Sequence, residues 1–419
     1  MSCCARSVVN RRRVALASCL CNAFVLLAHA GDPALQDGER IVLVGNTLIE
    51  RAAEHGYIET RLAALFPGQS IIVRNLGWSG DTVFADSRAG FDTAAEGFTR
   101  LSEWVQQLAP TWILVGYGGN EAYAGEPGLR HFLQGLERLL DMLSETGADI
   151  ALLAPIRHQD LGRPLPDPTA HNRHLRLYAE SMRDVASRRG HRWIELEPRL
   201  GIQARGQPST PLTDNGMHLN ALGYWRAGES IQEALGCSPF AWRAALTAEG
   251  EIVDSVGTEL SEVSAGGAGL EFVALDATLP EPPLPEMENA VVARPVDNRI
   301  LQIDGLSPGQ YELAIDDQHI VTADAEAWGA GVAITSGPEF DAVEALRAAI
   351  VHKNRLFFYR WRPQNTTYLF GFRSHEQGQN AEEVARLDPL IAAAQEEVTR
   401  LSAPRPHTYH LRPVDAADR

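Results

Sequence analysis

Residues 40–47 read Arg-Ile-Val-Leu-Val-Gly-Asn-Thr, a run of apolar residues that ends in a glycine and two polar residues. The apolar residues 41–44 have the length and β-branched composition of a buried parallel strand. A helical pattern follows at once over Leu48–Phe66. Because a strand that leads straight into a helix is the repeating unit of α/β folds, this stretch predicts a parallel sheet.

Strand and helix patterns alternate in the same way to about Gly236. Further short apolar runs predict strands at Ile71–Arg74, Trp112–Val115, Ile150–Leu153 and Trp193–Leu196. Amphipathic stretches between the runs predict helices at Phe98–Leu108, Leu129–Glu145, Asn172–Arg188 and Ala221–Leu235. The alternation predicts a five-stranded parallel sheet with helices on both faces, a flavodoxin-like α/β/α sandwich. Since ligands of such sheets bind at the carboxyl ends of the strands, the residues after each run are the candidate site.

Polar segments that contain glycine follow three of these runs, and a fourth such segment comes late in the domain. They are Gly45-Asn46-Thr47, residues 75–82 (Asn-Leu-Gly-Trp-Ser-Gly-Asp-Thr), Gly118–Glu121 and Thr213–Asn220. We expect the four segments to converge at one end of the sheet. A hydroxyl at a helix N-terminus, backbone amides beside glycines, a side-chain amide and a histidine are the parts of an acyl-transfer site.

The four segments resemble the conserved blocks of the SGNH (GDSL) hydrolase family, in the same order, across about residues 38–236. In that family a Gly-Asp-Ser block carries the nucleophile, at the position of Thr47. The resemblance makes Gly80 and Asn120 the oxyanion glycine and asparagine, and His218 the base. It implies an SGNH-type fold and hydrolysis of carboxylic esters.

The sequence also departs from the family pattern. Thr47 replaces the serine and Asn46 the aspartate before it. Asn215 stands where the family has its triad aspartate, and Glu121 replaces the aspartate after the oxyanion asparagine. Asp214 is one residue earlier and is a second candidate for orienting the histidine.

The altered residues still permit ester chemistry. The β-methyl group of threonine restricts its rotamers, but its hydroxyl is nucleophilic beside a suitable base. An asparagine orients a histidine without stabilising its charge, and the same change in a serine protease lowers turnover by about 10⁴. The predicted roles are nucleophile Thr47, base His218, orienting residue Asp214 or Asn215, and oxyanion donors Thr47, Gly80 and Asn120.

Each of these residues also has a purely structural interpretation. Thr47 is a favoured type of helix cap for a helix that begins at Leu48. His158, Asp160, His171 and His174 follow the fourth predicted strand, but the prolines beside them favour a solvated loop. The alternatives stay open at the level of the sequence.

After Cys237 the character of the sequence changes. Residues 241–345 combine proline-rich stretches with short alternating segments, and Ile300–Ile303, a turn at 305–309 and Tyr311–Ile315 predict a β-hairpin. The aromatic stretch Leu356–Arg373 and an amphipathic helix at Leu387–Leu401 follow. The predicted parts are a signal peptide (1–30), the α/β domain (31–240), a β-rich module (241–345) and an aromatic segment with a helical tail (346–419).

Aromatic and arginine side chains in the tail suit the faces and hydroxyls of sugars. They suggest a segment that folds over the mouth of the site, and the alternative is a seam between domains. The predicted substrate-binding residues are Trp78, Glu121, Arg360 and Trp361. Neither a cofactor nor a metal site is predicted, because His375 and Glu376 are too few for a metal ion.

The first thirty residues have the pattern of a secretory signal. Three arginines, at 11–13, precede an apolar run over Val14–Leu27, and Ala28-His29-Ala30 supplies a small-x-small cleavage site before Gly31. A lipoprotein signal ending at Cys19 is the alternative. We expect a periplasmic or secreted protein without a transmembrane anchor in the mature chain, and Cys237 would be its single cysteine.

The composition of the chain argues against nucleic acid as a binding partner. The chain has 419 residues, enough for two or three domains, and 54 acidic against 37 basic residues give a net charge of −17. Lys353 is the single lysine. An acidic chain without clustered cations is a poor binder of nucleic acid. The leading function is an esterase for acyl or acetyl esters, with a carbohydrate as one candidate substrate. The alternatives are a non-catalytic SGNH-fold protein that binds a glycan or similar ligand, and acyl transfer to a hydroxyl.

Overall fold

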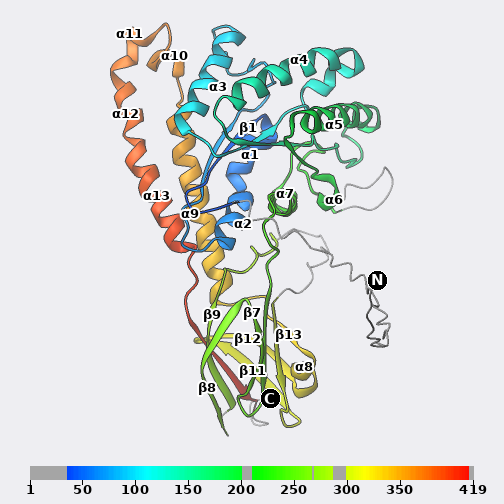
Figure 1. Cartoon of the computed structure of the whole chain (residues 1–419), viewed down its shortest axis with the longest axis vertical. Helices are drawn as coiled ribbons and strands as arrows, with labels where there is room; N and C mark the ends of the chain where they lie inside the picture. The colour runs from blue at the N-terminus through cyan, green and yellow to red at the C-terminus, as the bar shows by residue number, and fades with distance from the viewer. Residues whose placement is uncertain (1–34, 201–209, 267–268, 286–298, 415–419) are drawn as a thin grey trace, which may run out of the picture. The chain divides into compact units, whose positions relative to one another are not determined.

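A computed structural model describes residues 35–200, 210–266, 269–285 and 299–414 (Figure 1). The predicted signal peptide lies outside these residues. No helix within the described ranges has the length and apolar character needed to cross a bilayer.

The central sheet has five parallel strands, as the sequence predicts, and the structure gives their order as β2-β1-β3-β4-β5. Its strands are β1 (Arg40–Gly45), β2 (Ile72–Gly77), β3 (Trp112–Gly116), β4 (Asp149–Leu153) and β5 (Arg192–Ile194). The chain turns to opposite sides of β1 for β2 and β3, so the switch point where such sheets bind ligands lies between β1 and β3.

Helices cover both faces of this sheet, and β1 shows why. Ile41 and Leu43 belong to one apolar core, whereas Val42 and Val44 belong to the other, because successive side chains of a strand point to opposite faces. The first core includes α1 (Thr47–His55), α2 (Tyr57–Leu65) and α7 (Ala221–Ala234). The second includes α3 (Ala94–Leu108), α4 (Gly125–Ser144) and α5 (Thr169–Arg189).

Glycines at the carboxyl ends of three strands allow the chain to approach closely there. Gly45 pairs with Gly77 on one side and with Gly116 on the other. A Cβ atom on Gly45 would lie 2.4 Å from the carbonyl oxygen of Gly116, and one on Gly77 would lie 2.2 Å from the backbone nitrogen of Glu50. Helix α1 can therefore start directly against the edge of the sheet.

The second half of the chain contains two further sheets, with the orders β13-β10-β6-β7 and β12-β11-β14-β9-β8. Their strands are β6 (Trp242–Thr247), β7 (Ile252–Val256), β8 (Thr258–Gly266), β9 (Gly269–Asp276), β10 (Arg299–Asp304), β11 (Gln310–Ile315), β12 (Gln318–Asp324), β13 (Val332–Ala333) and β14 (His407–Pro413). Side chains from both sheets, including Trp242, Leu313 and Tyr409, share one apolar core.

The hairpin predicted over residues 300–315 is wrong in its pairing. Both strands exist, as β10 and β11, but β10 pairs with β6 and β13, and β11 pairs with β12 and β14. A turn between two strands indicates where the chain bends, whereas burial decides which neighbour each strand takes. The last strand, β14, also enters this sheet from the tail, across the boundary predicted at residue 345.

Two long helices of the tail, α9 (Pro338–Trp361) and α13 (Leu387–Leu401), pack against each other, and α9 also packs against α1, α2 and β2. The aromatic residues Phe357 and Trp361 are therefore part of the second core of the central sheet. Lys353 on α9 is fully buried, forms an ion pair with Glu59 of α2 and donates to the carbonyl oxygen of Val73. Short helices α10 (Thr366–Leu369), α11 (Ser374–Gln377) and α12 (Ala381–Ala385) connect α9 to α13.

Candidate active site

Thr47 opens helix α1 directly after the central strand β1. The helix is capped by Asn46, whose side chain accepts a hydrogen bond of 3.1 Å from the backbone N–H of Leu48. The Thr47 hydroxyl therefore does not serve as the cap. Its oxygen instead accepts the N–H of Gly80 at 3.2 Å. The candidate nucleophile and the candidate oxyanion glycine are thus in direct contact, at the positive end of a helix.

The loop after β2 presents the Gly80 amide. Gly80 has a φ of +76°, a conformation that favours glycine, so the loop turns sharply at this residue. Two hydrogen bonds tie the loop to the end of β1 and to α1. The N–H of Trp78 donates to the carbonyl oxygen of Gly45 at 2.9 Å, and the N–H of Ser79 donates to the Glu50 carboxylate at 2.5 Å. Asn120, the second predicted oxyanion residue, donates through its amide to the backbone oxygen of Asp81 at 2.7 Å.

A buried ionic network lies behind this loop. The Asp81 carboxylate is fully buried and accepts hydrogen bonds from the guanidinium of Arg88 at 2.6 Å and from the hydroxyl of Tyr117 at 2.8 Å. Arg88 also donates to the carbonyl oxygen of Leu76 at 2.7 Å. The network connects the end of β2 to the end of β3, and so fixes the spacing between the two loops that carry Gly80 and Asn120.

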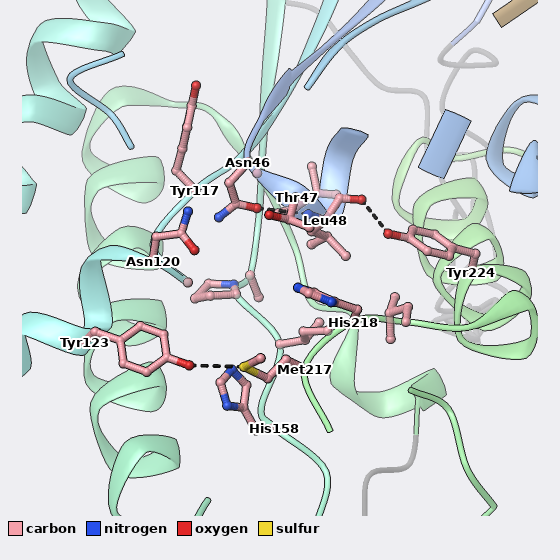
Figure 2. Close-up of a pocket in the computed structure, with 17 residues that line it drawn as sticks. Asn46, Thr47, Leu48, Tyr117, Asn120, Tyr123, His158, Met217, His218 and Tyr224 are labelled. Carbon is pink, nitrogen blue, oxygen red and sulfur yellow. Dashed lines mark hydrogen bonds between the residues drawn. The ribbon is translucent and has the colours of Figure 1, made fainter. Parts of the chain in front are cut away.

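His218 lines the same pocket as Thr47 and Asn120 (Figure 2). Its ring nitrogen Nδ1 is 3.2 Å from the side-chain nitrogen of Asn215. The side-chain oxygen of Asn215 already accepts the backbone N–H groups of Met217 at 3.2 Å and His218 at 3.0 Å. Of the two orienting residues that the sequence leaves open, Asn215 is therefore the one that contacts the imidazole.

The orientation of Asn215 determines which nitrogen of His218 carries the proton. An amide NH₂ group can only donate, so Nδ1 must accept, and the proton of the neutral ring lies on Nε2. In Ser-His-Asp sites the carboxylate holds the proton on Nδ1 and leaves Nε2 free to act as the base. The arrangement at Asn215 therefore favours the tautomer that is less suited to general-base catalysis.

Burial and charge keep the His218 ring neutral. Burial lowers the pKa of His218, and the nearby Arg51 guanidinium lowers it further, while Asp214 opposes both effects. The Asp214 carboxylate forms an ion pair with Arg51 at 2.6 Å, and its side chain is 53% exposed. Asp214 thus acts on His218 through its charge, with its carboxylate directed to Arg51.

Thr47, Asn120 and His218 line one pocket of about 80 Å³, together with side chains that the four sequence blocks do not single out. Among these are Tyr123, whose hydroxyl donates to the sulfur of Met217 at 3.2 Å, and His158. The expectation of a solvated loop is wrong for His158, which lines the pocket. Its position after β4, at the same end of the sheet, is the signal in the sequence that points to it.

Burial lowers the pKa of His158 to about 4, and the neighbouring His171 and His218 contribute in the same direction. The His158 ring lies 4.6 Å from that of His171, which stacks on Tyr123 at 4.0 Å between ring centres. This wall of the pocket is therefore aromatic and uncharged at neutral pH.

The four predicted substrate-binding residues lie elsewhere. The Glu121 carboxylate accepts the backbone N–H groups of Val83 at 2.9 Å and Gly118 at 2.8 Å, and burial raises its pKa to about 7. Arg360 forms an ion pair with Asp388 at 2.8 Å. Trp361 is buried and packs edge-on against Trp78, with 5.6 Å between ring centres. None of the four is among the residues that line the Thr47 pocket.

Within the described ranges, no group of three or more His, Cys, Asp or Glu side chains is arranged to hold a metal ion. The site consists of a hydroxyl, backbone and side-chain amides and an imidazole. The expectation of a site without metal or cofactor stays a prediction.

Comparisons with known proteins bear on the family and the fold of this chain. Residues 44–226 match the GDSL-like Lipase/Acylhydrolase family, which confirms the resemblance drawn from the four blocks. A gut microbial diltiazem-metabolizing enzyme has a similar structure over 91% of this chain and 98% of its own, with a TM-score of 0.72 and 18% sequence identity. At this identity the likeness shows the fold, and because it covers 91% of the chain it extends beyond the α/β domain.

Other solved structures match about half of the chain. A catalytic mutant of an acetylxylan esterase from Geobacillus stearothermophilus covers 49% of this chain with 97% of its own, at 16% identity and a TM-score of 0.40. No curated protein sequence matches the chain significantly.

Proposed function

With a GDSL-like domain at residues 44–226 as the premise, we propose that this protein is an exported hydrolase of carboxylic esters that carry a small acyl group. One observation carries the proposal: the Thr47 hydroxyl accepts the N–H of Gly80 in a pocket that Asn120 and His218 also line. The candidate nucleophile, the oxyanion asparagine and the base therefore line one small pocket, and Gly80 contacts the nucleophile's oxygen.

The proposed reaction has two steps. The Thr47 oxygen attacks the ester carbonyl carbon while His218 takes the hydroxyl proton, and the amides of Thr47, Gly80 and Asn120 hold the oxyanion. The C–O bond to the alcohol then breaks, and the alcohol leaves with the proton from His218. Water hydrolyses the acyl-threonine by the same route, and the carboxylic acid leaves.

The size of the pocket supports a short acyl group. Sites that enclose drug-sized ligands have about 300–1,000 Å³, whereas this pocket has about 80 Å³. An acetyl group is the smallest common acyl group and suits this volume. Acetyl esters are accordingly the substrates to test first.

The contact between Asn215 and His218 predicts a low turnover rate. Because its amide favours the proton on Nε2 of His218, only the minor tautomer of the neutral ring is ready to act as the base. The β-methyl group of Thr47 adds a steric restriction on the approach of the ester. We therefore expect turnover well below that of a Ser-His-Asp site.

The second candidate function is binding without turnover, and the same Asn215 contact favours it. A His218 ring that carries its proton on Nε2 is a hydrogen-bond donor, suited to hold the carbonyl of an ester or a carboxylate. In this role the pocket recognises an acyl group and releases it unchanged.

Hydrolysis of p-nitrophenyl acetate separates the two. The unmodified protein, Thr47→Ala and His218→Ala would be compared with matched controls at exposed sites, Thr99→Ala and His352→Ala. The hydrolase proposal predicts a loss of about 100-fold or more in both site variants and none in the controls. Equal background rates in all five proteins would leave the binding role.

Export rests on residues 1–30, and it has its own test. In a secreting bacterial host, the protein recovered outside the cytoplasm is expected to begin at Gly31. A protein that stays in the cytoplasm with Met1 retained would contradict export.

A further inference from the structure

A second cavity, of about 310 Å³, lies beside the loop that carries Gly80. Its walls come from α3 and the chain before it, from Trp78, and from the end of α9 with the segment around α10 (Figure 1). The aromatic side chains that line it are Trp78, Phe91, Trp104, Trp361, Phe370 and Phe372. The cavity is thus built from two parts of the chain that are far apart in sequence.

The charged side chains of this cavity are already paired. Arg88 is bound to Asp81 at 2.6 Å, and Arg362 is bound to Glu50 at 2.7 Å. Arg100 pairs with Asp92 at 2.9 Å and donates to the carbonyl oxygens of Arg88 and Ala89. A charged ligand would have to compete with these pairs, and a sugar would find few polar groups free to replace its water.

Two exposed phenylalanines stand at the edge of the cavity. Phe91 is 82% exposed and Phe372 is 70% exposed, and their rings meet edge to face at 6.4 Å between centres. Large apolar side chains gain by leaving water, and a ring packed against this pair would cover part of both. Edge-to-face and offset contacts with the surrounding aromatic rings would add to this gain.

We propose that this cavity is a binding site for a neutral aromatic group of about two fused rings. Its volume is at the lower end of the range of sites that take drug-sized molecules. Aromatic walls with paired charges suit a flat, uncharged, apolar group better than a sugar or an anion. The carbohydrate expected for the tail from its sequence is therefore not the ligand that this cavity favours.

The cavity is coupled to the Gly80 loop by two contacts. The Arg362 guanidinium stacks on the ring of Trp78 at 3.8 Å, and it binds the same Glu50 carboxylate that holds the N–H of Ser79. A ring bound here has two possible sources: the alcohol part of the ester itself, or a separate small molecule. The first source rests on the proposed function, whereas the site itself does not.

Calorimetric titration of the mature protein with 2-naphthol tests the site without any turnover. We expect one equivalent to bind, and the Phe91→Ala/Phe372→Ala variant to raise the dissociation constant about tenfold. Tyr359→Ala, an exposed aromatic residue outside the cavity, and Thr47→Ala are expected to change nothing. Absence of binding, equal binding in all variants, or tighter binding of xylobiose would overturn the proposal.

Hydrolysis of 2-naphthyl acetate and of ethyl acetate distinguishes the two sources. If the ring belongs to the substrate, the double variant raises KM for the naphthyl ester about tenfold and leaves kcat/KM for ethyl acetate unchanged. If the ligand is separate, KM is unchanged for both esters and 2-naphthol does not compete with either. When no variant hydrolyses any ester, the proposed function has failed, and the calorimetric result still decides on the site.

Discussion

The two cavities next to the Gly80 loop differ in what their polar groups can still do. In the small pocket, a hydroxyl, an amide and an imidazole face the same volume, and the amide of Asn215 sets the protonation of the imidazole. In the larger cavity, the guanidinium groups are paired and aromatic rings form the walls. A catalytic group must still be able to form hydrogen bonds with a substrate. A site that binds an uncharged ring works best when its charged side chains are already in ion pairs.

The largest expected effect concerns the small pocket alone. Asn215→Asp keeps the oxygen that accepts the N–H groups of Met217 and His218, and it replaces the NH₂ group beside Nδ1 with an acceptor. The ring proton then moves to Nδ1 and frees Nε2. Turnover of p-nitrophenyl acetate should rise by up to about 10⁴, the factor that the opposite change, Asp to Asn, costs a serine protease.

Asn380→Asp, at an exposed position in the tail, is the control for the added charge. Binding of 2-naphthol should be the same in both variants. A rate that stays at background in Asn215→Asp would mean that more than the tautomer is missing from the small pocket.

The next largest effect concerns the packing of α9 against the central sheet, because the end of α9 forms part of the wall of the larger cavity. Lys353→Met removes one partner of a fully buried ion pair and leaves the Glu59 carboxylate without its charge partner. We expect the free energy of unfolding to fall by about 3–5 kcal/mol. Adding Glu59→Leu should recover most of this loss, because the buried carboxylate that has lost its ion-pair partner is then removed.

Denaturant unfolding at pH 7 measures both variants, with the exposed Arg355→Met as the control, which should stay within about 0.5 kcal/mol of the unmodified protein. A Lys353→Met variant as stable as this control would show that the pair does not hold α9 to the central sheet.

Glu50 tests whether the two cavities are coupled. Glu50→Ala removes the acceptor of the Ser79 N–H and the partner of Arg362 at once. The loop with Gly80 and the wall with Trp78 should both loosen. We expect kcat for p-nitrophenyl acetate to fall about tenfold and 2-naphthol to bind several times more weakly, since each charge-assisted hydrogen bond contributes about 1.5–3 kcal/mol.

Glu54→Ala, an exposed residue one helical turn later, controls for the loss of an acidic residue from α1. If Glu50→Ala altered only one of the two measurements, the cavities would be independent of each other.

The smallest effect is a shift in pH dependence. Burial and Arg51 lower the pKa of His218, so the acid limb of kcat/KM should have its midpoint below the ordinary value of 6.5, with a constant rate above it. Arg51→Met removes a charge that lowers this pKa and should move the limb to higher pH. Asp214→Asn removes a charge that raises it and should move the limb to lower pH.

Both shifts of the midpoint should stay within about one pH unit, because exposed charges are screened by water. A pH profile of ester hydrolysis for the three proteins gives the answer. Shifts in the same direction for both variants would exclude His218 as the group that titrates.

Local patterns in the sequence predict much of the α/β domain. Runs such as 41–44 alternate between two apolar cores because every strand of a covered parallel sheet is buried on both faces, so the composition alone marks them. The ends of the strands meet at one edge of the sheet by topology. The four blocks therefore suffice to place Thr47, Asn120 and His218 around one pocket, with Gly80 in contact with the Thr47 hydroxyl.

Other features depend on partners that are distant in sequence. The strands at Ile300 and Tyr311 look like a hairpin, yet they pair in different sheets, because each finds its apolar neighbours elsewhere in the chain. Phe357 and Trp361 look like a surface for sugars, yet α9 buries them against the central sheet. Periodicity indicates that a residue has an apolar face to cover but not which element covers it.

The sequence by itself determined the alternation of strands and helices, the four blocks at one edge of the sheet and the altered residues Thr47 and Asn215. Only the tertiary structure decided that Asn215 turns its NH₂ group to His218, that Asp214 turns away to Arg51, and that the tail closes an aromatic cavity over Trp78. The physical reason is one of range. Strand and helix patterns come from neighbours a few residues apart, whereas hydrogen-bond direction and cavity walls depend on groups brought together by packing.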